Sequence, residues 1–259
     1  MRQEPMSLSS DGERREDRNR SGLMEALRAA VPALIIAVLI RALLFEAFNI
    51  PSGSMKATLL VGDYMFVSKY SYGFTHYSLP FSPRWFSGRI FGATPERGDV
   101  AVFRLPKDDS IDYVKRVIGL PGDRIKLVDG LLFINGKAVK RERADDFIDD
   151  EGHVGERVLR WRETLPNGVS YQTLDLQDDN PLENTDEYVV PPGHFFMMGD
   201  NRDNSADSRV LSAVGYVPFE NLIGKAQIIF FSIGGDEPAW HIWNWPWSVR
   251  WSRLFTLVK

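Results

Sequence analysis

The hydrophobic and polar positions divide the chain into three regions of different character. Residues 1–22 are polar and charged, so they cannot bury enough apolar surface to offset the entropy lost on ordering, and we expect a disordered tail. An apolar segment follows at 23–41, with a continuous apolar run at 29–40. From residue 42 onward, short apolar stretches alternate with Gly, Pro, Asn and Asp, which predicts short strands joined by turns.

The apolar segment at 23–41 is predicted to be a single transmembrane anchor. It reaches about the 17-residue lower limit for spanning a bilayer, provided that Arg28 extends toward the interface. Several arginines precede the run and only Arg41 and Lys56 follow closely, which predicts a cytoplasmic N-terminus and an exported remainder. No small-x-small site follows the run, so we expect an uncleaved anchor rather than a signal peptide. A buried core helix is the alternative.

The exported part is predicted to be an all-β domain with an insertion. We expect strands near 59–67, 100–105, 112–118, 124–128 and 131–134, with a hairpin turn at Asn135-Gly136. Residues 140–187 are acidic and turn-rich, which indicates an inserted hairpin or cap, and strand character resumes at 188–190, 194–198 and 222–233. The predicted divisions are a β core at 42–139 and 188–239, the insertion at 140–187, and a C-terminal segment at 240–259.

The C-terminal segment at 240–259 carries five of the seven tryptophans, interleaved with basic residues. The indole ring favours a membrane interface because it joins an apolar body to one N–H donor. The sequence is equally compatible with packing of this segment on the β domain. Both interpretations hold if one face of the segment packs on protein and the other contacts lipid. These tryptophans are Trp240, Trp243, Trp245, Trp247 and Trp251.

Composition excludes several classes of function. The net charge of -4 argues against a nucleic-acid-binding surface, and the absence of cysteine excludes disulfides, thiolate metal sites and a cysteine nucleophile. The four histidines show no HExxH spacing, so a zinc protease is poorly supported. The loop at 199–209 departs from a calcium-binding EF-hand loop because Arg202 stands at its third position and the final Glu is missing. We therefore expect no metal and no cofactor.

Ser54 is a candidate nucleophile because it lies in a Gly-flanked turn that can leave its hydroxyl exposed. A serine hydroxyl needs a base, and neither a GxSxG elbow nor a histidine in a catalytic context is present. Lys115 is the candidate base, since in a strand it shares one face with Tyr113 and Val117, and burial beside large side chains depresses a lysine pKa. Ser205 is a candidate hydrogen-bond donor to the amine. The ordinary alternatives are a loop serine and a solvated edge lysine.

Together these stretches resemble bacterial signal peptidase I, the membrane-bound leader peptidase family. The resemblance covers most of the chain after Arg41, and it implies a mainly β, barrel-like catalytic core of the signal peptidase and LexA type with an inserted β-hairpin subdomain. Several motifs in this order are far more specific than any one alone. The motifs are Ile50-Pro51-Ser52-Gly53-Ser54-Met55, Gly62-Asp63-Tyr64, Arg97-Gly98-Asp99-Val100, the run at 112–123 and the loop at 199–209.

The resemblance also implies roles for individual residues. Ser54 would be the nucleophile and Lys115 the general base, with the Ser54 N–H and the Ser52 hydroxyl as oxyanion donors. Ser205 would orient the lysine, and Asp207 and Arg209 would support that loop. Shallow apolar pockets for small side chains would be lined by Phe48, Ile50, Met55, Leu59, Tyr113, Val114 and Met197.

The function implied is that of a serine endopeptidase that removes signal peptides from exported preproteins after small-x-small sites. It would be a single-pass protein of the bacterial inner membrane, with signal peptides and the bilayer as partners and no nucleic acid. Two departures from the family pattern are Ala57, where proline is usual, and a short insertion after Arg124 without a cysteine pair. The rivals are a LexA-type self-cleaving protein and a non-catalytic anchored β domain that binds partners.

Overall fold

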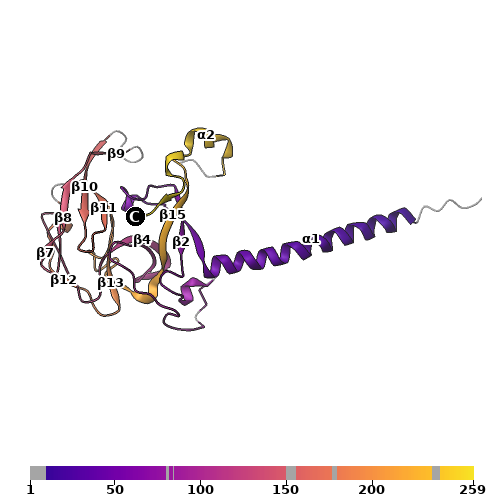
Figure 1. Ribbon diagram of the computed structural model, residues 1–259, viewed down its shortest axis with the longest axis horizontal. Coiled ribbons are helices and arrows are strands. Elements are labelled where there is room, and N and C mark those ends of the chain that lie inside the picture. The colour runs from indigo at the N-terminus through magenta and orange to yellow at the C-terminus, as the bar shows by residue number, and fades with distance from the viewer. Residues whose placement is uncertain (1–9, 80–81, 84, 150–155, 177–179, 235–239) are drawn as a thin grey trace, which may run out of the picture. The chain divides into compact units, whose positions relative to one another are not determined.

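The computed structural model describes residues 10–79, 82–83, 85–149, 156–176, 180–234 and 240–259 (Figure 1). The chain separates into two compact units, Met1–Ala42 and Leu43–Lys259. The first unit contains all but the last residue of helix α1 (Ser10–Leu43), which has Pro32 in its interior.

Helix α1 begins inside the segment 1–22 for which the sequence predicts disorder, whereas residues 1–9 of that segment lie outside the described residues. The difference has a physical reason: arginine and glutamate are good helix formers, and extending an existing helix costs less than starting one. The transmembrane anchor predicted at 23–41 lies within α1. In the part of the chain that the structure describes, no helix has both the length and the apolar character needed to cross a bilayer.

The second unit is built on an eight-stranded antiparallel sheet among the described residues. Its central strand β3 is buried on both faces, whereas β1 at one edge alternates between exposed and half-buried positions. The strands in spatial order are β1 (Phe45–Asn49), β2 (Asp63–Ser68), β15 (Leu222–Ser232), β3 (Val100–Leu105), β4 (Asp108–Gly119), β13 (His194–Met198) and β14 (Val217–Pro218), with β16 (Thr256–Leu257) on β15.

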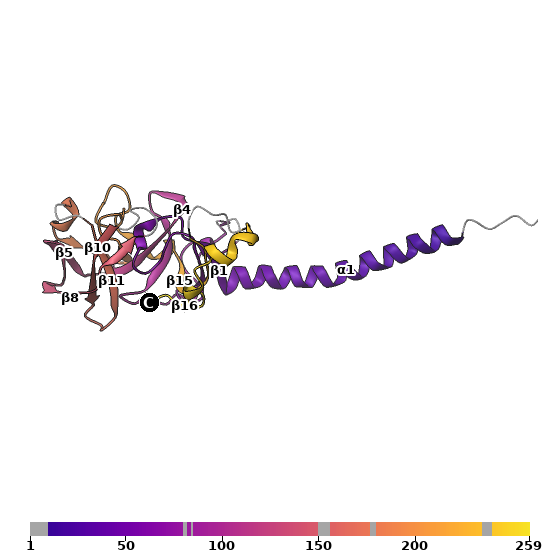
Figure 2. The ribbon, with the colours of Figure 1, turned by 90° about the horizontal axis from the view of Figure 1, so that it is seen from above.

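Two smaller sheets complete the strands of the described chain. Figures 1 and 2 both show β8, β10 and β11 gathered at one end of the β unit, away from β15. One sheet contains β8 (Lys140–Arg143), β9 (Phe147–Asp149), β10 (Glu156–Thr164) and β11 (Ser170–Asp175). The other contains β5 (Arg124–Val128), β6 (Leu131–Ile134), β7 (Lys137–Ala138) and β12 (Tyr188–Val189).

Short helices occupy several connections of the β unit. The α-helix α2 (Trp245–Ser248) lies in the C-terminal segment, where the Trp245 ring packs on Phe231 at a centroid distance of 5.0 Å. The 3-10 helices are Gly53–Met55, His76–Ser78, Pro181–Glu183, Phe219–Asn221, Ile242–Asn244 and Trp251–Arg253.

The barrel-like closure expected of the β core is not present in the described chain. The large sheet is an open series whose end strands, β1 and β14, do not pair with each other among the described residues. A closed barrel requires hydrogen bonds between its first and last strands. Strand β14 contains only two residues, both of which pair with β13, so it offers little edge for closure.

The turn at Asn135-Gly136 follows from the local sequence. Both residues have positive φ, 52° and 75°, as a two-residue type I′ hairpin turn requires. The turn joins β6 to β7, with Ile134 opposite Lys137. The predicted hairpin is therefore confirmed.

Within the described residues the buried apolar side chains form three clusters, and two of them support the site described below. One cluster lies beneath the turn at 50–59 and contains Met55 and Leu59, with exposed fractions of 1% and 0%. A second cluster joins the large sheet to the smaller ones through side chains such as Ile118, Leu165 and Phe196. Residues of the 140–187 segment thus contribute to the same core as the large sheet.

Candidate active site

Ser54 lies in the 3-10 helix Gly53–Met55, a few residues after the end of β1. The loop that carries it is closed at its base, because the Ile50 N–H donates to the Asp63 carbonyl at 2.8 Å and the Gly62 N–H donates to the Ile50 carbonyl at 2.9 Å. Beneath it, Met55 is buried in the apolar cluster. This anchoring fixes the loop while leaving Ser54 half-buried rather than enclosed.

Lys115 on β4 meets this serine. Its Nζ lies 2.5 Å from Ser54 Oγ, within hydrogen-bond distance, although the two residues are 61 positions apart in the chain. The Tyr113 ring, two residues earlier on the same strand, lies 5.2 Å from Nζ. The two side chains that sequence reasoning selected for different reasons therefore come into direct contact.

The amine of Lys115 is buried, with 3% of the residue exposed. Burial lowers its pKa from the usual 10.5 to about 8, because an ammonium group loses solvation in this environment. Asp207 and Asp200 oppose this effect and Arg209 adds to it, but burial is the largest influence. A substantial fraction of the amine is therefore neutral near pH 8, as a general base requires.

The loop at 199–209 holds the backbone of the serine turn. The Asn201 N–H donates to the Ser54 carbonyl at 3.1 Å, and its side-chain amide donates to the Gly53 carbonyl at 3.1 Å. Asn201 itself is 2% exposed. One buried residue thus fixes the two peptide groups on either side of the Ser54 Cα.

Gly199 makes this contact possible through its lack of a side chain. A Cβ added there would lie 2.5 Å from the Ser54 carbonyl oxygen and 2.2 Å from Ser205 Oγ, both closer than real Cβ contacts. The Gly199 N–H also donates to Asp207 Oδ2 at 3.0 Å. Glycine is required at position 199 because the Ser54 turn and Ser205 approach it closely.

The supporting residues of this loop are brought together as expected, with one difference. Arg209 binds Asp207 through two hydrogen bonds of 2.8 Å, and both residues are buried. Burial opposes ionisation of Asp207, but Arg209 outweighs it and lowers the pKa of the carboxyl. Ser205 Oγ contributes to that lowering, yet it has no partner of normal hydrogen-bond geometry among the described residues. The hydrogen bond expected from Ser205 to Lys115 is thus not observed.

A cavity of about 490 Å³ opens beside the two side chains. It runs between the edge strand β1, the serine turn, the middle of β4 and the exposed residues Asn204 and Ala206 of the 199–209 loop. Of the residues expected in substrate pockets or at the oxyanion, it is lined by Phe48, Ile50, Ser52, Ser54, Met55, Tyr113 and Val114.

Two expected pocket residues lie elsewhere. Leu59 and Met197 are fully buried, each at 0% exposure in an apolar cluster, and neither lines the cavity. Sequence reasoning also missed other lining residues, among them Ile111, Asp112, Asn204 and Ala206. Strand alternation places Ile111 on the face of Tyr113 and could have found it, whereas the exposure of Asn204 and Ala206 in the loop is a property of the structure with no signal in the sequence.

An ion pair behind the lysine was also missed. Arg116 is 0% exposed and donates to both carboxylate oxygens of Asp200, at 2.8 and 2.6 Å. Asp200 Oδ2 also accepts from the Thr58 hydroxyl at 2.5 Å. The pair therefore joins the strand of Lys115, the loop at 199–209 and the turn after Ser54. A basic residue directly after the candidate base and an acidic residue in the polar loop were the available signals.

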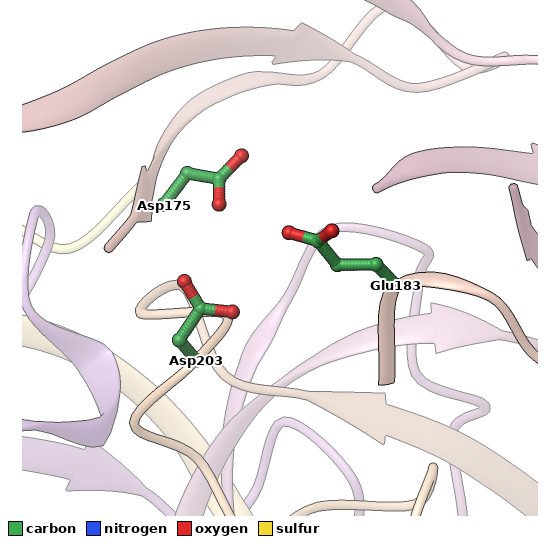
Figure 3. A group of neighbouring side chains, drawn as sticks. All are labelled: Asp175, Glu183 and Asp203. Carbon is green, nitrogen blue, oxygen red and sulfur yellow. The ribbon is translucent and has the colours of Figure 1, made fainter. Parts of the chain in front are cut away.

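A group of three carboxylates includes one residue of this loop: Asp203 points toward Asp175 and Glu183, and they toward it (Figure 3). One oxygen from each lies within 4.8 Å of the others, a spacing compatible with a cation. Burial and the neighbouring Asp175 and Asp203 raise the pKa of Glu183 to about 7. Arg141 donates to Asp175 at 2.6 Å and so offsets part of the negative charge.

The sequence of this chain is similar to those of known peptidases. Residues 23–231 match the family described as signal peptidase, peptidase S26. The chain is 47% identical over 237 residues to the signal peptidase I of Rickettsia canadensis (strain McKiel), a match that covers 85% of this chain and 88% of that protein. It is 40% identical over 257 residues to the signal peptidase I of Rickettsia bellii (strain OSU 85-389), covering 93% and 87%.

Among solved structures, a signal peptidase I from Enterococcus faecalis V583 is 26% identical and matches with a TM-score of 0.31, covering 51% of this chain and 97% of that one. The family match and the relatives each cover most of the chain. The chain therefore belongs to the signal peptidase family, peptidase S26, as an enzyme of the signal peptidase I type.

Proposed function

We propose that this enzyme cleaves signal peptides with Ser54 as nucleophile and Lys115 as general base. The observation that carries the proposal is the 2.5 Å separation of Lys115 Nζ and Ser54 Oγ. Lowering the pKa of Lys115 from 10.5 to about 8 raises the neutral fraction of the amine at pH 8 by roughly a hundredfold. A buried amine at this distance is thus available to accept the serine proton.

Acylation then proceeds by a balanced transfer of one proton. The Lys115 amine takes the proton of Ser54 Oγ as that oxygen attacks the scissile carbonyl carbon, and a C–O bond forms. The ammonium group next donates its proton to the leaving nitrogen as the C–N bond breaks. The mature polypeptide leaves with a free amino terminus, and the signal peptide remains as an ester on Ser54.

Deacylation repeats the same steps with water. The neutral amine removes a proton from water, the resulting hydroxide adds to the ester carbonyl, and the proton returns to Ser54 Oγ as it leaves. In both acylation and deacylation, the oxygen of the attacked carbonyl group becomes negatively charged in the tetrahedral intermediate. We assign the Ser54 N–H and the Ser52 hydroxyl as the donors that stabilise it, since Ser52 lines the same cavity.

Specificity for small-x-small sites is proposed to come from the shallow apolar wall of the cavity. Phe48, Ile50 and Val114 contribute to this wall. Large side chains at the corresponding substrate positions would collide with this wall, and exclusion of the wrong substrate is an effective route to specificity.

We further propose that the enzyme is held at the bacterial inner membrane as a single-pass protein with its catalytic unit on the outer side. Apolar side chains along α1, such as Leu34, Ile35 and Leu39, are more than half exposed. Trp243 and Trp247 of the C-terminal segment are exposed at 65% and 84%, as suits a bilayer interface. A cleavage site just beyond a substrate's apolar segment would then meet the catalytic serine at the bilayer surface.

The test is processing of a purified preprotein with a small-x-small site by the wild-type protein, Ser54→Ala and Lys115→Ala. We expect wild type to release the signal peptide and both variants to lose at least a thousandfold in kcat, because the nucleophile or its base is missing. Ser212→Ala and Lys126→Ala, elsewhere in the chain, are matched controls that retain activity. Processing by either site variant at the wild-type rate contradicts the assignment.

The same assay separates the rivals from this proposal. Cleavage of the chain itself without processing of the preprotein would indicate the self-cleaving, LexA-type reaction. Binding of the preprotein without any cleavage would indicate a binding domain. A preprotein with Phe at the two small positions should be cleaved at least a hundredfold more slowly, if the cavity wall sets the specificity.

A further inference from the structure

Another buried ion pair joins the sheet of β8–β11 to the loop at 199–209. Arg202 of the loop donates directly to Glu163 Oε2 of β10, and the side chains are 6% and 1% exposed. The Tyr171 hydroxyl, from β11, donates to the same carboxylate oxygen at 2.8 Å and lies 3.2 Å from Arg202 Nη2. Three side chains from three segments thus meet at one oxygen atom.

The loop backbone is held to the same sheet beside this ion pair. The Leu174 N–H donates to the Asp200 carbonyl at 2.9 Å, and the Arg202 N–H donates to the Leu174 carbonyl at 3.0 Å. Between these two bonds lies Asn201, which forms a parallel bridge with Leu174. The side chain and the peptide N–H of Asn201 in turn fix the carbonyls of Gly53 and Ser54. A continuous series of contacts therefore runs from β10 and β11 to the serine turn.

The ion pair is an inefficient source of stability. Glu163 Oε1 and the Nε and Nη1 atoms of Arg202 are buried without hydrogen-bond partners among the described residues. Each unpaired buried polar atom carries a desolvation cost, and an apolar pair of similar volume is often as stable as a buried ion pair. Stability alone therefore does not explain the charged residues at positions 163 and 202, whereas orientation of the 199–209 loop does.

We propose that Glu163 is a positioning residue for catalysis, which acts through Arg202 and Asn201 to hold the Ser54 turn against Lys115. The proposal rests on the assignment of Ser54 and Lys115 above, and it gives the strands at 140–187 a role in the reaction. Glu163 lines no part of the substrate cavity, so it affects turnover rather than substrate binding.

The test is the full-length double variant Glu163→Leu/Arg202→Met, which replaces the ion pair by an apolar pair and leaves no unpaired charge. We expect it to fold with a Tm close to that of wild type, to retain KM, and to lose about tenfold to a hundredfold in kcat, as misplacement by up to about 1 Å does. Tyr171→Phe, which removes only one hydrogen bond to Glu163, should lower kcat by a smaller factor.

The matched control is Arg97→Met/Asp123→Leu, which removes a largely buried ion pair at a distance in sequence from the 199–209 loop. It should lower Tm, because Asp123 also accepts hydrogen bonds from the Leu120 N–H and the Asn135 side-chain amide, without lowering kcat per folded molecule. If Glu163→Leu/Arg202→Met keeps wild-type kcat, or loses kcat only in proportion to unfolding, the positioning role is refuted. Ser54→Ala, measured in parallel, distinguishes this outcome from failure of the proposed nucleophile, because only the latter leaves Ser54→Ala active.

Discussion

Substitution of Gly199 by alanine places one methyl group between the Ser54 turn and the loop at 199–209. The new Cβ would lie 2.5 Å from the Ser54 carbonyl oxygen, whereas ordinary contacts of this kind begin at 3.4 Å. The two segments must therefore separate by roughly 1 Å, and the hydrogen bonds from Asn201 to the Gly53 and Ser54 carbonyls lengthen. We expect kcat to fall about a hundredfold and the free energy of unfolding to fall by about 1–3 kcal/mol.

The assay is steady-state cleavage of a preprotein, with stability measured separately by urea unfolding. Gly92→Ala is the matched control, since its added Cβ would meet side-chain atoms of Arg89 and Phe219 at 3.3–3.4 Å and no backbone. It should retain kcat to within about twofold, as expected of a substitution without a severe overlap. A Gly199→Ala enzyme with wild-type kcat would show that the approach of these two segments does not matter for catalysis.

Three further predictions concern the turn, the carboxylate group and the membrane. Ala57 occupies the third position of the turn Met55–Thr58 with φ of 88°, so Ala57→Gly should raise the free energy of unfolding by about 0.5–1 kcal/mol in urea titrations; a decrease would contradict this. The raised pKa of Glu183 means that the folded protein keeps a proton that the unfolded chain has lost between pH 4.5 and about 7, so stability falls as pH rises through this window. Solvent access reduces this loss to about 1 kcal/mol. In urea titrations at pH 5 and pH 7.5, the free energy of unfolding of wild type should fall by this amount and that of Glu183→Gln should not. An equal fall in both proteins would refute the assignment. Leu34→Glu/Leu39→Glu should shift the protein from the membrane fraction to the supernatant on flotation, and unchanged flotation would exclude α1 as the attachment.

The sequence was informative where local chemistry determines the structure. Asn135-Gly136 predicted a hairpin, because only residues that tolerate positive φ suit a type I′ turn. The alternation of large side chains along 112–118 predicted a buried Lys115, and the amine is buried. The serine, the lysine and the polar loop were identified individually by their composition and order.

Features that depend on contacts between segments distant in the sequence could not be predicted from local sequence patterns. Leu59 and Met197 were expected in substrate pockets, but apolar side chains next to a cavity and apolar side chains beneath it have the same sequence pattern. The open order of the large sheet depends on which edges pair, and the strand pattern does not encode this. The role of Gly199 depends on how closely Ser54 approaches it in space, although 145 positions separate them in the sequence.

The central claim is that a neutral Lys115 amine removes the proton of Ser54, and the pH dependence of kcat/KM tests it most directly. Because kcat/KM reports the free enzyme, it should rise about tenfold per pH unit below pH 8 and level off above, with a midpoint near the pKa of about 8. Lys115→Arg should be inactive over the whole of this pH range, since a guanidinium group remains protonated throughout. A wild-type profile that is flat between pH 6.5 and 9.5, the range spanning the expected midpoint, would contradict the account.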